Sequence, residues 1–375
     1  MLRPLLLFLL MSVTPAPSGA AEPLPANRWT PLPTEANGFK RPQHAGLAYD
    51  SRRRRLLVFG SDTHGRHWDN SVWACDLADG RWHRLDGPPS RPASYRVTAD
   101  GVPVAGEPGA PRPWAMHTYD GLVYDPVHDQ LIVAADPGHN PKGKKHPYRS
   151  NPVWRFDLRT LRWQFDPPTA NTPRLFNAVS AWDSARSIAV LGRFGLWEPD
   201  PEHGGWRKVG DKPPPIGHST LVHDDRRRQF ALFGHSRLTN EVWIYHPGSA
   251  PATDGRWERR TPGGDAAPHD QHIPAAFASR AGLYVLVIDD NATVLKPNGR
   301  RKLVEKPRRS LTFLYDPDAD RYIRLRGAEL PPQEMNFMMT YDPGLDAVLL
   351  VTGNWRHPVR ILALRVDPAA AHAQH

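Results

Sequence analysis

Cysteine is nearly absent from this chain of 375 residues, in which Cys75 stands alone. No disulfide can form within the chain, so the fold must gain its stability by burying apolar surface. Long hydrophobic runs are scarce as well. The longest, Leu5 to Val13, covers about nine residues, whereas a helix that spans a bilayer needs about twenty. We therefore expect no membrane span.

This apolar run has the flanks of a secretory leader. Arg3 precedes it, and the small residues Ser18-Gly19-Ala20 follow it, as at signal peptide cleavage sites. No cysteine follows directly that could take a lipid. We expect residues 1–20 to be a signal peptide and the mature protein to be secreted or periplasmic.

Helical periodicity is also rare. Apolar residues seldom recur at helical spacing over the length of a helix, and 41 prolines interrupt the chain. Proline breaks helices and central strands but is common between short strands. The composition therefore favours an all-β fold.

Acidic residues are outnumbered, with 39 Asp and Glu against 48 Lys and Arg, which gives a formal charge of +9. A basic protein attracts anionic partners. Outside the cell we expect that partner to be an acidic polysaccharide or oligosaccharide rather than nucleic acid. We expect the protein to act as a monomer.

One four-strand pattern recurs along the chain. In its best copy the first strand ends at Tyr49-Asp50, the apolar strand Leu56 to Gly60 follows, and the third and fourth strands carry Trp73 and Trp82. Four short strands per copy are typical of a β-propeller blade. Six copies of the first strand end at Tyr49-Asp50, Tyr124-Asp125, Trp182-Asp183, His223-Asp224, Phe277-Ala278 and Tyr341-Asp342.

The sixth copy lacks its fourth strand, because the repeat runs out at Asp367. The missing strand is at the other end of the chain, where Arg28-Trp29 begins in the same way as Arg81-Trp82. We predict that the N-terminal strand completes the last blade, which would leave no open edge in the ring. Residues 21–368 would form a single β-propeller domain, with a disordered tail over residues 369–375.

The spacing resembles that of the kelch propeller family, from about Trp29 to Asp367. Kelch blades usually have a glycine pair after the second strand, whereas this chain has the single glycines Gly60, Gly234 and Gly353. We therefore expect a divergent, six-bladed kelch-like β-propeller. The alternative is seven blades, with Pro88 to Pro113 forming the seventh around a hairpin.

The long insertions of the predicted blades fall on one face, where the first strands begin. They are Ser61 to Asn70, Pro88 to Pro113, Asp136 to Pro152 and Asp289 to Arg309. Long loops on a rigid scaffold often carry binding residues. The arginine runs Arg52 to Arg55 and Arg226 to Arg228 fall in short turns of the opposite face, where we expect them to be solvated.

Polar residues open all six channel strands, five places before the aromatic residue of the repeat. Channel strands face water, so polar residues are expected there for any function, but the choice of His, Tyr and Arg over Ser, Thr and Gly favours a functional mouth. The second strands close on the same face with Asp62 and His64, with His139 and with Arg193. We expect the substrate-binding residues to be His44, Asn177, His218, His235, His272 and Asn336, together with Lys144 of the basic loop beside His139.

β-Elimination of a uronate fits this mouth, since it needs a cation for the carboxylate, a base and an acid. His117, His139 and Arg193 resemble an arrangement in propeller polysaccharide lyases of the ulvan lyase type, where a histidine pair brackets two strands and an arginine closes the next blade. The resemblance implies a histidine base, with Arg193 on the carboxylate. It departs at Asn177, where those enzymes have a tyrosine, so Tyr119 would have to replace that tyrosine as the acid. The residues predicted to be catalytic are His117, Tyr119, His139 and Arg193.

Two other functions stay open. One resembles the sialic-acid epimerase type of kelch propeller, in which Arg193 would act with Glu198 or Asp136 on an acidic monosaccharide. The other is a module that binds carbohydrate or protein without catalysis. The three functions differ in their products, because only a lyase makes an unsaturated sugar from a polymer.

No cofactor and no metal ligand is assigned. A divalent metal ion is an alternative if His44, His218, His235 and His272 converge, but no short ligand spacing joins them. Cys75 stands where other blades have Phe156 and Tyr245, so we expect it in the core. A buried Cys75 argues against the Tyr–Cys copper cofactor of galactose oxidase, the best-known kelch-like enzyme.

Overall fold

The structure of the chain is a computed structural model. It describes residues 23–65, 67–142, 148–149, 151–166, 168, 172–173, 175–234, 241–248, 255–290, 293–295, 301–303, 306–353 and 357–373.

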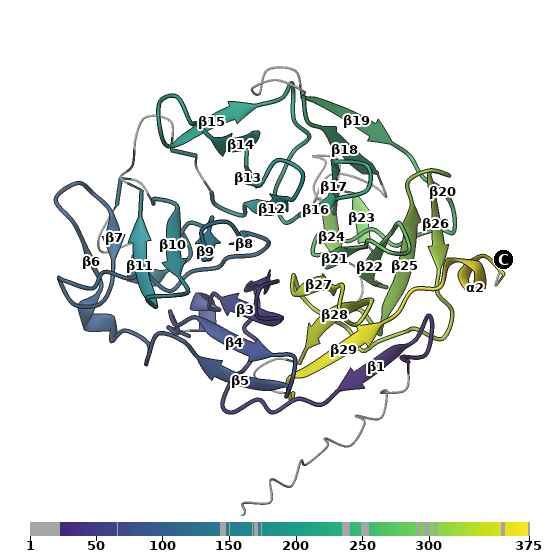
Figure 1. Cartoon of the computed structure of the whole chain (residues 1–375), viewed down its shortest axis with the longest axis horizontal. Helices are drawn as coiled ribbons and strands as arrows, with labels where there is room; N and C mark the ends of the chain where they lie inside the picture. Colours follow the sequence, from purple (N-terminus) through teal and green to yellow (C-terminus); the bar gives the residue numbers. More distant parts are fainter. Residues whose placement is uncertain are drawn as a thin grey trace, which may run out of the picture.

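Six antiparallel sheets stand side by side in a ring, which makes the protein a six-bladed β-propeller (Figure 1). Blade 1 contains β2 (Gly46–Asp50), β3 (Arg55–Phe59), β4 (Trp73–Asp76) and β5 (Arg81–Arg84). Blade 2 contains β8 (Leu122–Asp125), β9 (Gln130–Val133), β10 (Trp154–Asp157) and β11 (Arg162–Phe165). Blade 3 contains β12 (Val179–Asp183), β13 (Ile188–Gly192), β14 (Leu196–Pro199) and β15 (Trp206–Val209).

The other three blades repeat this order. Blade 4 contains β16 (Thr220–Asp224), β17 (Gln229–Phe233), β18 (Val242–His246) and β19 (Arg256–Arg260). Blade 5 contains β21 (Ala275–Ala278), β22 (Leu283–Asp289), β25 (Ser310–Asp316) and β26 (Arg321–Arg324), with β20 (Gly263–Gly264) at its outer edge. Blade 6 contains β27 (Met339–Asp342), β28 (Ala347–Thr352), β29 (Arg360–Leu364) and β1 (Trp29–Leu32).

The N-terminal strand completes the last blade, as predicted. β1 pairs antiparallel with β29, from Trp29 opposite Leu364 to Leu32 opposite Ile361. Two further hydrogen bonds tie the ends of the ring together, from the Asn27 side-chain amide to the Asp367 carbonyl at 3.0 Å and from the Asp367 amide to Asn27 Oδ1 at 2.9 Å. The ring is therefore closed by the two ends of the chain.

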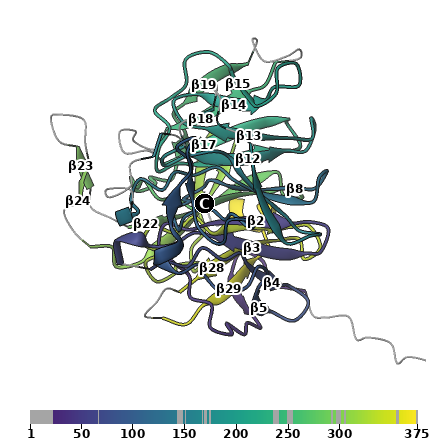
Figure 2. The same cartoon turned by 90° about the vertical axis from the view of Figure 1, so that its left-hand side faces the viewer.

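The alternative of a seventh blade is wrong. The segment between blades 1 and 2 forms the short helix η2 (Pro92–Ser94) and a hairpin of β6 (Arg96–Val97) and β7 (Pro103–Val104), whose two-residue strands pair only with each other. Strands of that length cannot form a blade. A second hairpin, β23 (Thr293–Leu295) and β24 (Arg301–Leu303), belongs to the connection between β22 and β25 and stands away from the ring (Figure 2).

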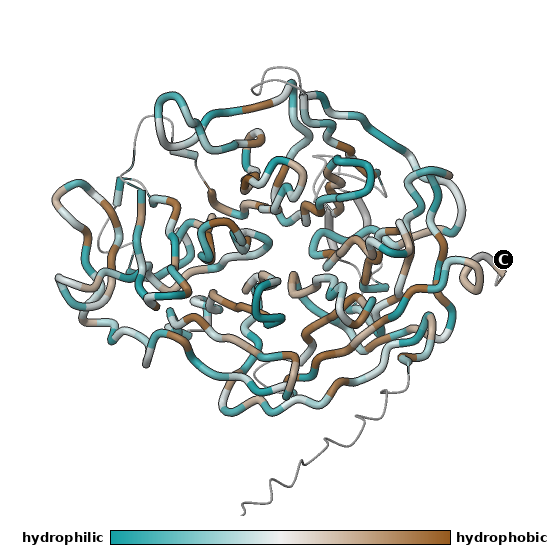
Figure 3. The backbone as a smooth tube through the Cα atoms, in the orientation of Figure 1, coloured by the Kyte–Doolittle hydropathy of each residue, from teal (hydrophilic) through white to brown (hydrophobic). Residues whose placement is uncertain are grey.

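The hydrophobic core lies between neighbouring blades, because both faces of the inner strands are buried. In β3, Leu57 and Phe59 pack into the core shared with blade 2, whereas Leu56 and Val58 pack into the core shared with blade 6. Burial of such side chains stabilises the fold by about 1.5–3 kcal/mol each. Cys75 is 0% exposed and lies opposite Trp82, which confirms its place in the core. Figure 3 shows hydrophobic stretches within the blades around the ring.

In five of the six blades the first strand ends in an aspartate that has a structural role in the following turn. Asp50 Oδ1 accepts hydrogen bonds from the amides of Arg52 and Arg53, both at 3.1 Å. Such side-chain caps satisfy turn amides that have no strand partner. The same bonds to turn amides are made by Asp125, Asp183, Asp224 and Asp342.

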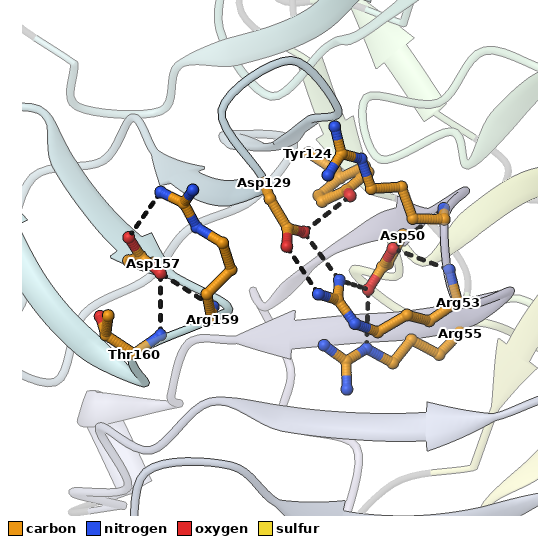
Figure 4. A network of polar contacts seen from close by, with 9 residues as sticks. Asp50, Arg53, Arg55, Tyr124, Asp129, Asp157, Arg159 and Thr160 are labelled. Atoms are coloured by element: carbon orange, nitrogen blue, oxygen red, sulfur yellow. Dashed lines mark hydrogen bonds and ion pairs between the residues drawn. The ribbon is translucent and has the colours of Figure 1, made fainter.

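The arginine runs were expected to be solvated, but several of their side chains form ion pairs with neighbouring blades. Figure 4 shows the guanidinium of Arg53 between Asp50 of its own blade and Asp129 of blade 2, with contacts of 2.7 and 2.6 Å to the two oxygens of Asp129. Arg54 contacts Asp342 of blade 6 at 2.9 Å. These turns therefore link blades to one another.

Past the last strand, the segment expected to be a disordered tail begins with the short helix α2 (Pro368–His372). Asp367 caps it by accepting hydrogen bonds from the amides of Ala369 and Ala370, and Ala371 packs against the core between blades 5 and 6. In the described part of the chain, no helix has both the length and the apolar character needed to cross a membrane.

Candidate functional site

The mouth of the channel is the side of the ring where the first strand of each blade begins. Three long connections meet there around a small aromatic core: Trp68 from the β3–β4 connection, Tyr95 and Trp114 from the β5–β8 connection, and Tyr148 from the β9–β10 connection. The Asn140 side-chain amide donates to the Ala115 carbonyl at 2.7 Å, and that of Asn70 donates to the Pro113 carbonyl at 2.9 Å. This core holds the loops that carry the site in one arrangement.

Four of the residues that open the channel strands share a backbone conformation. In four blades the opening residue has a positive φ between 48° and 65°, which turns the chain sharply into its strand: His44, Tyr119, Asn177 and His218. Residues other than glycine seldom adopt this conformation, and it often marks functional sites. The His44 carbonyl accepts hydrogen bonds from the amides of Thr118 and Tyr119, at 2.9 and 2.7 Å, which joins blades 1 and 2 at the mouth.

Four histidines from blades 1 and 2 lie together at the mouth. The rings of His44 and His117 stack with centroids 4.3 Å apart and an interplanar angle of 8°. His64, in the short helix η1 (Thr63–Gly65), lies 4.7 Å from His117 and 4.5 Å from His139 between ring centroids. One nitrogen each of His44, His64 and His117 lies within 4.8 Å of the other two.

His117 is 2% exposed, and both of its ring nitrogens have partners. Nδ1 lies 3.1 Å from the Tyr119 hydroxyl, and Nε2 lies 3.2 Å from Thr63 Oγ1 and 3.9 Å from Asp62 Oδ1. In a neutral imidazole one nitrogen donates and the other accepts. The ring is therefore fixed in orientation by oxygen atoms on both sides.

A second group lies across the channel from these histidines. His218 Nε2 is 2.9 Å from the side-chain nitrogen of Asn177, and His218 Nδ1 is 3.1 Å from His272 Nε2. Tyr119 lies between the two groups, with its ring 5.5 Å from that of His44 and 5.3 Å from that of His218. Contacts through Tyr119 and His218 thus connect the named mouth residues of blades 1 to 5.

Arg193 closes β13 beside the second group. Its guanidinium donates to the Ile216 carbonyl and lies over the Phe194 ring, 4.4 Å from the centroid. Among the described residues no carboxylate pairs with it, and its Nε has no hydrogen-bond partner. It also helps to lower the pKa of His218. Arg193 is therefore a cation near the mouth with its charge uncompensated by the described carboxylates.

Burial determines the charge of the mouth. Desolvation lowers the pKa of His44 and of His218 to about 4 and lowers those of His117, His139 and His272 as well. Neighbouring histidines reinforce the effect on His44 and His117. Desolvation raises the pKa of the Tyr119 hydroxyl. At neutral pH these imidazoles are uncharged, with lone pairs available, and Tyr119 keeps its proton.

The predicted site residues separate into groups. His44, Tyr119, His117 and His139 are in contact, and Asn177, His218 and His272 lie together with Arg193 near them. Asn336 is 0% exposed, and its side chain bonds within blade 6, to the Val351 carbonyl and the Met338 amide. The predicted residues His235 and Lys144 lie outside the described residues.

The sequence placed His64 at the mouth but did not assign it to the site, and it gave no part to Thr63 or Phe337. His64 and Thr63 contact His117, and Phe337 packs against Tyr119 and His272 with ring centroids 5.6 Å apart in both pairs. The pattern Asp62-Thr63-His64 directly after a buried second strand was the available signal. The grouping of histidines also differs from the predicted metal set, because His44 joins His64 and His117 while His218 and His272 bond to each other.

The opposite side of the channel has a different character. A cavity of about 320 Å³ is lined by the first strands of all six blades and by turn residues such as Ser51, Ser184 and Asp225. Asp120 reaches this cavity, and its carboxylate accepts a hydrogen bond from the Leu221 amide at 2.7 Å. The histidine-rich mouth and this cavity are therefore two distinct environments.

No family model matches the sequence, and no curated protein matches it. Among solved structures, the chain is similar to TolB from Acinetobacter baumannii, with a TM-score of 0.42 and 11% sequence identity. The similarity covers 77% of this chain and 54% of that chain, so this chain spans about half the length of the protein that it matches.

Proposed function

We propose that the channel mouth binds the carboxylate of an acidic carbohydrate. The observation that supports this most directly is Arg193, a half-buried guanidinium for which the described residues supply no carboxylate partner. Burying a cation without a partner is unfavourable, and a ligand carboxylate would provide the missing charge and two acceptor oxygens. The amide of Asn177 and the imidazole of His218 would supply further hydrogen bonds beside it.

The chemistry that fits the mouth is β-elimination of a uronate. His139 would act as the base, because it is half-buried, its pKa is lowered by burial, and no described residue forms a hydrogen bond to it. It would take the proton from the carbon next to the carboxylate. A carbon–carbon double bond would then form as the bond to the glycosidic oxygen breaks, and that oxygen would receive a proton from Tyr119. His117, bonded to the Tyr119 hydroxyl, would position it.

Binding without catalysis is the second candidate, and one observation favours it. Tyr119 is only 3% exposed, so a sugar has little access to its hydroxyl. The epimerase alternative has less support, because Glu198 is 2% exposed and pairs with Arg186 at 2.6 Å. Asp136 Oδ1 accepts a hydrogen bond from Tyr148 at 2.6 Å. In keeping with a polymeric substrate outside the cell, we propose that residues 1–20 direct export.

The first test is binding and turnover of a panel of uronate polysaccharides by the mature chain. Ultraviolet absorbance reports unsaturated uronate, and calorimetry reports binding. We expect Arg193→Ala to bind about 10- to 100-fold more weakly, the effect of losing a charge-assisted hydrogen bond. Arg52→Ala is the matched control, because it removes the same charge from an exposed turn of the opposite face.

The outcomes separate the two candidates. Absorbance that rises with the unmodified chain and is lost in His139→Ala supports elimination. Binding without any rise supports the binding module. Equal affinity of Arg193→Ala and the unmodified chain for every acidic glycan would overturn the carboxylate site itself.

A further inference from the structure

We propose that His44, His64 and His117 bind a divalent transition-metal ion, of which zinc is the most suitable, at the channel mouth. This inference goes beyond the proposed function, because it involves none of the residues that would bind the carboxylate. It stands on the convergence of three imidazole nitrogens from two blades within 4.8 Å of one another.

The spacing of the three nitrogens is close to what a metal ion needs. Bonds of about 2.0–2.1 Å from zinc to imidazole place ligand nitrogens about 3.3–3.5 Å apart around a tetrahedral ion. The cluster would have to contract by little more than about 1 Å to reach this spacing. His64 can supply the movement, because it is exposed and sits on the short helix η1, while His44 and His117 are 7% and 2% exposed.

The ligand set selects the class of metal. Three imidazole ligands suit zinc, copper or nickel, whereas calcium and magnesium prefer oxygen ligands. His44 Nδ1 is buried and has no hydrogen-bond partner in the described part of the chain. An imidazole nitrogen that is removed from water without a partner is unfavourable, and metal coordination would relieve it.

The hydrogen-bond partners of His117 resemble those of metal-binding histidines. Metal-binding histidines usually bond through their second nitrogen to an oxygen atom, which orients the ring. His117 has an oxygen partner at each nitrogen, Tyr119 on one side and Thr63 on the other, so either nitrogen can bind the ion while the other keeps its partner. Asp62, whose carboxylate is 3.9 Å from His117, would balance the charge of the ion.

Three protein ligands leave a tetrahedral ion with one open position, as in catalytic zinc sites. His139 lies beside the cluster, with its ring 4.5 Å from that of His64 and 4.7 Å from that of His117. The open position would accept water or an oxygen of an anionic ligand. A bound ion would also add positive charge to the mouth.

The test uses the mature chain made without a polyhistidine tag and stripped with a chelator. Zinc binding is measured by calorimetry and by elemental analysis after dialysis, and cobalt is used as a spectroscopic probe. We expect one ion per chain, and visible cobalt absorption typical of a tetrahedral site. His64→Ala should weaken zinc binding by about 100-fold or more, since loss of even an outer partner of a ligand costs about 10- to 100-fold.

Two controls keep the test decisive. His203→Ala removes an exposed histidine in a blade 3 turn and should bind zinc as the unmodified chain does. Arg193→Ala should also keep the ion, so failure of the carboxylate site and failure of the metal site are distinguishable. Retained folding of His64→Ala is checked by circular dichroism. If the unmodified chain takes up no stoichiometric zinc, or if His64→Ala and His203→Ala bind it equally, the metal site is wrong.

Discussion

Asp120 forms hydrogen bonds to two other blades, but the burial of its carboxyl lowers the stability of the fold at neutral pH. Its backbone carbonyl accepts a hydrogen bond from the Ser180 hydroxyl of blade 3 at 2.9 Å, and its carboxylate accepts one from the Leu221 amide of blade 4 at 2.7 Å. Burial raises the pKa of this carboxyl well above its ordinary value. The folded state therefore favours the protonated form, whereas the unfolded chain ionises freely.

We expect Asp120→Asn to stabilise the protein at neutral pH. A carboxyl whose pKa is raised on folding contributes stability below its unfolded pKa of about 3.9, and that contribution is lost as the pH rises through the folded pKa. Asparagine keeps an acceptor for the Leu221 amide and does not ionise. Denaturant unfolding between pH 3 and pH 8 measures the effect.

The two unfolding curves should agree near pH 3 and separate as the pH rises, with the variant more stable. Asp100→Asn, at an exposed position, is the control and should follow the unmodified chain at every pH. Parallel curves for Asp120→Asn across the range would show that the carboxyl is not perturbed.

At the level of single residues, the sequence predicted the core position of Cys75 but not the grouping of the histidines. The core position of Cys75 followed from its alignment with Phe156 and Tyr245. Which histidines meet did not follow, because that depends on positive φ angles such as that of His44 and on loop packing around Trp114. Neither has a periodic signature in the sequence.

At the scale of elements, the turns between first and second strands join the blades. Arg53 lies between Asp50 and Asp129, and Arg227 likewise joins Asp224 to Asp318 of blade 5, with contacts of 2.9 and 2.5 Å. The hydrogen bonds from Arg53 lower the pKa of Asp129 to about 2. Composition alone could not predict these pairs, because they depend on which turns are neighbours around the ring.

We expect Arg53→Ala to lower the free energy of unfolding by about 1–2 kcal/mol at pH 7. The Asp129 side chain is 4% exposed and would lose its partner, but Arg53 is 35% exposed, so the loss is smaller than the about 3–5 kcal/mol of a fully buried pair. Arg52→Ala, which changes an exposed neighbour, is the control. Chemical denaturation of both variants gives the comparison.

The same pair predicts a dependence on pH. Asp129 has a folded pKa below its unfolded value, so its contribution is present above about pH 4 and is lost as the pH falls through about 2. The difference between Arg53→Ala and the unmodified chain should shrink over that window. A difference that stays constant down to pH 2 would contradict the ion pair as its cause.

For the whole molecule, closure of the ring by β1 was predicted from the sequence and is confirmed. Arg28-Trp29 matched the start of the fourth strands, and the repeat of blades left only one place for it. The blade count followed from the repeat too, because each copy supplies one sheet. The irregular mouth did not follow, since its loops differ from blade to blade.

Removal of residues 23–32 should destabilise the entire ring and not only blade 6. β29 would then present an unpaired edge, and Trp29 would no longer donate its hydrogen bond to Thr312 at 2.8 Å. We expect a lower melting temperature together with self-association through the exposed edge. Calorimetry and light scattering measure the two effects, and a peptide of residues 23–36 added in trans should reverse both. A truncated chain that melts like the full one would contradict this role of β1.

The pairing of Asn27 with Asp367 has a consequence for the order of assembly on the ribosome. β1 must wait, unpaired, until β29 and Asp367 have been synthesised, so the ring cannot close before that point. Circular permutation would remove this delay. If the adjacent ends were joined by a short linker and the chain reopened between two other blades, β1 and β29 would become neighbours in the sequence and blade 6 could fold as a local unit.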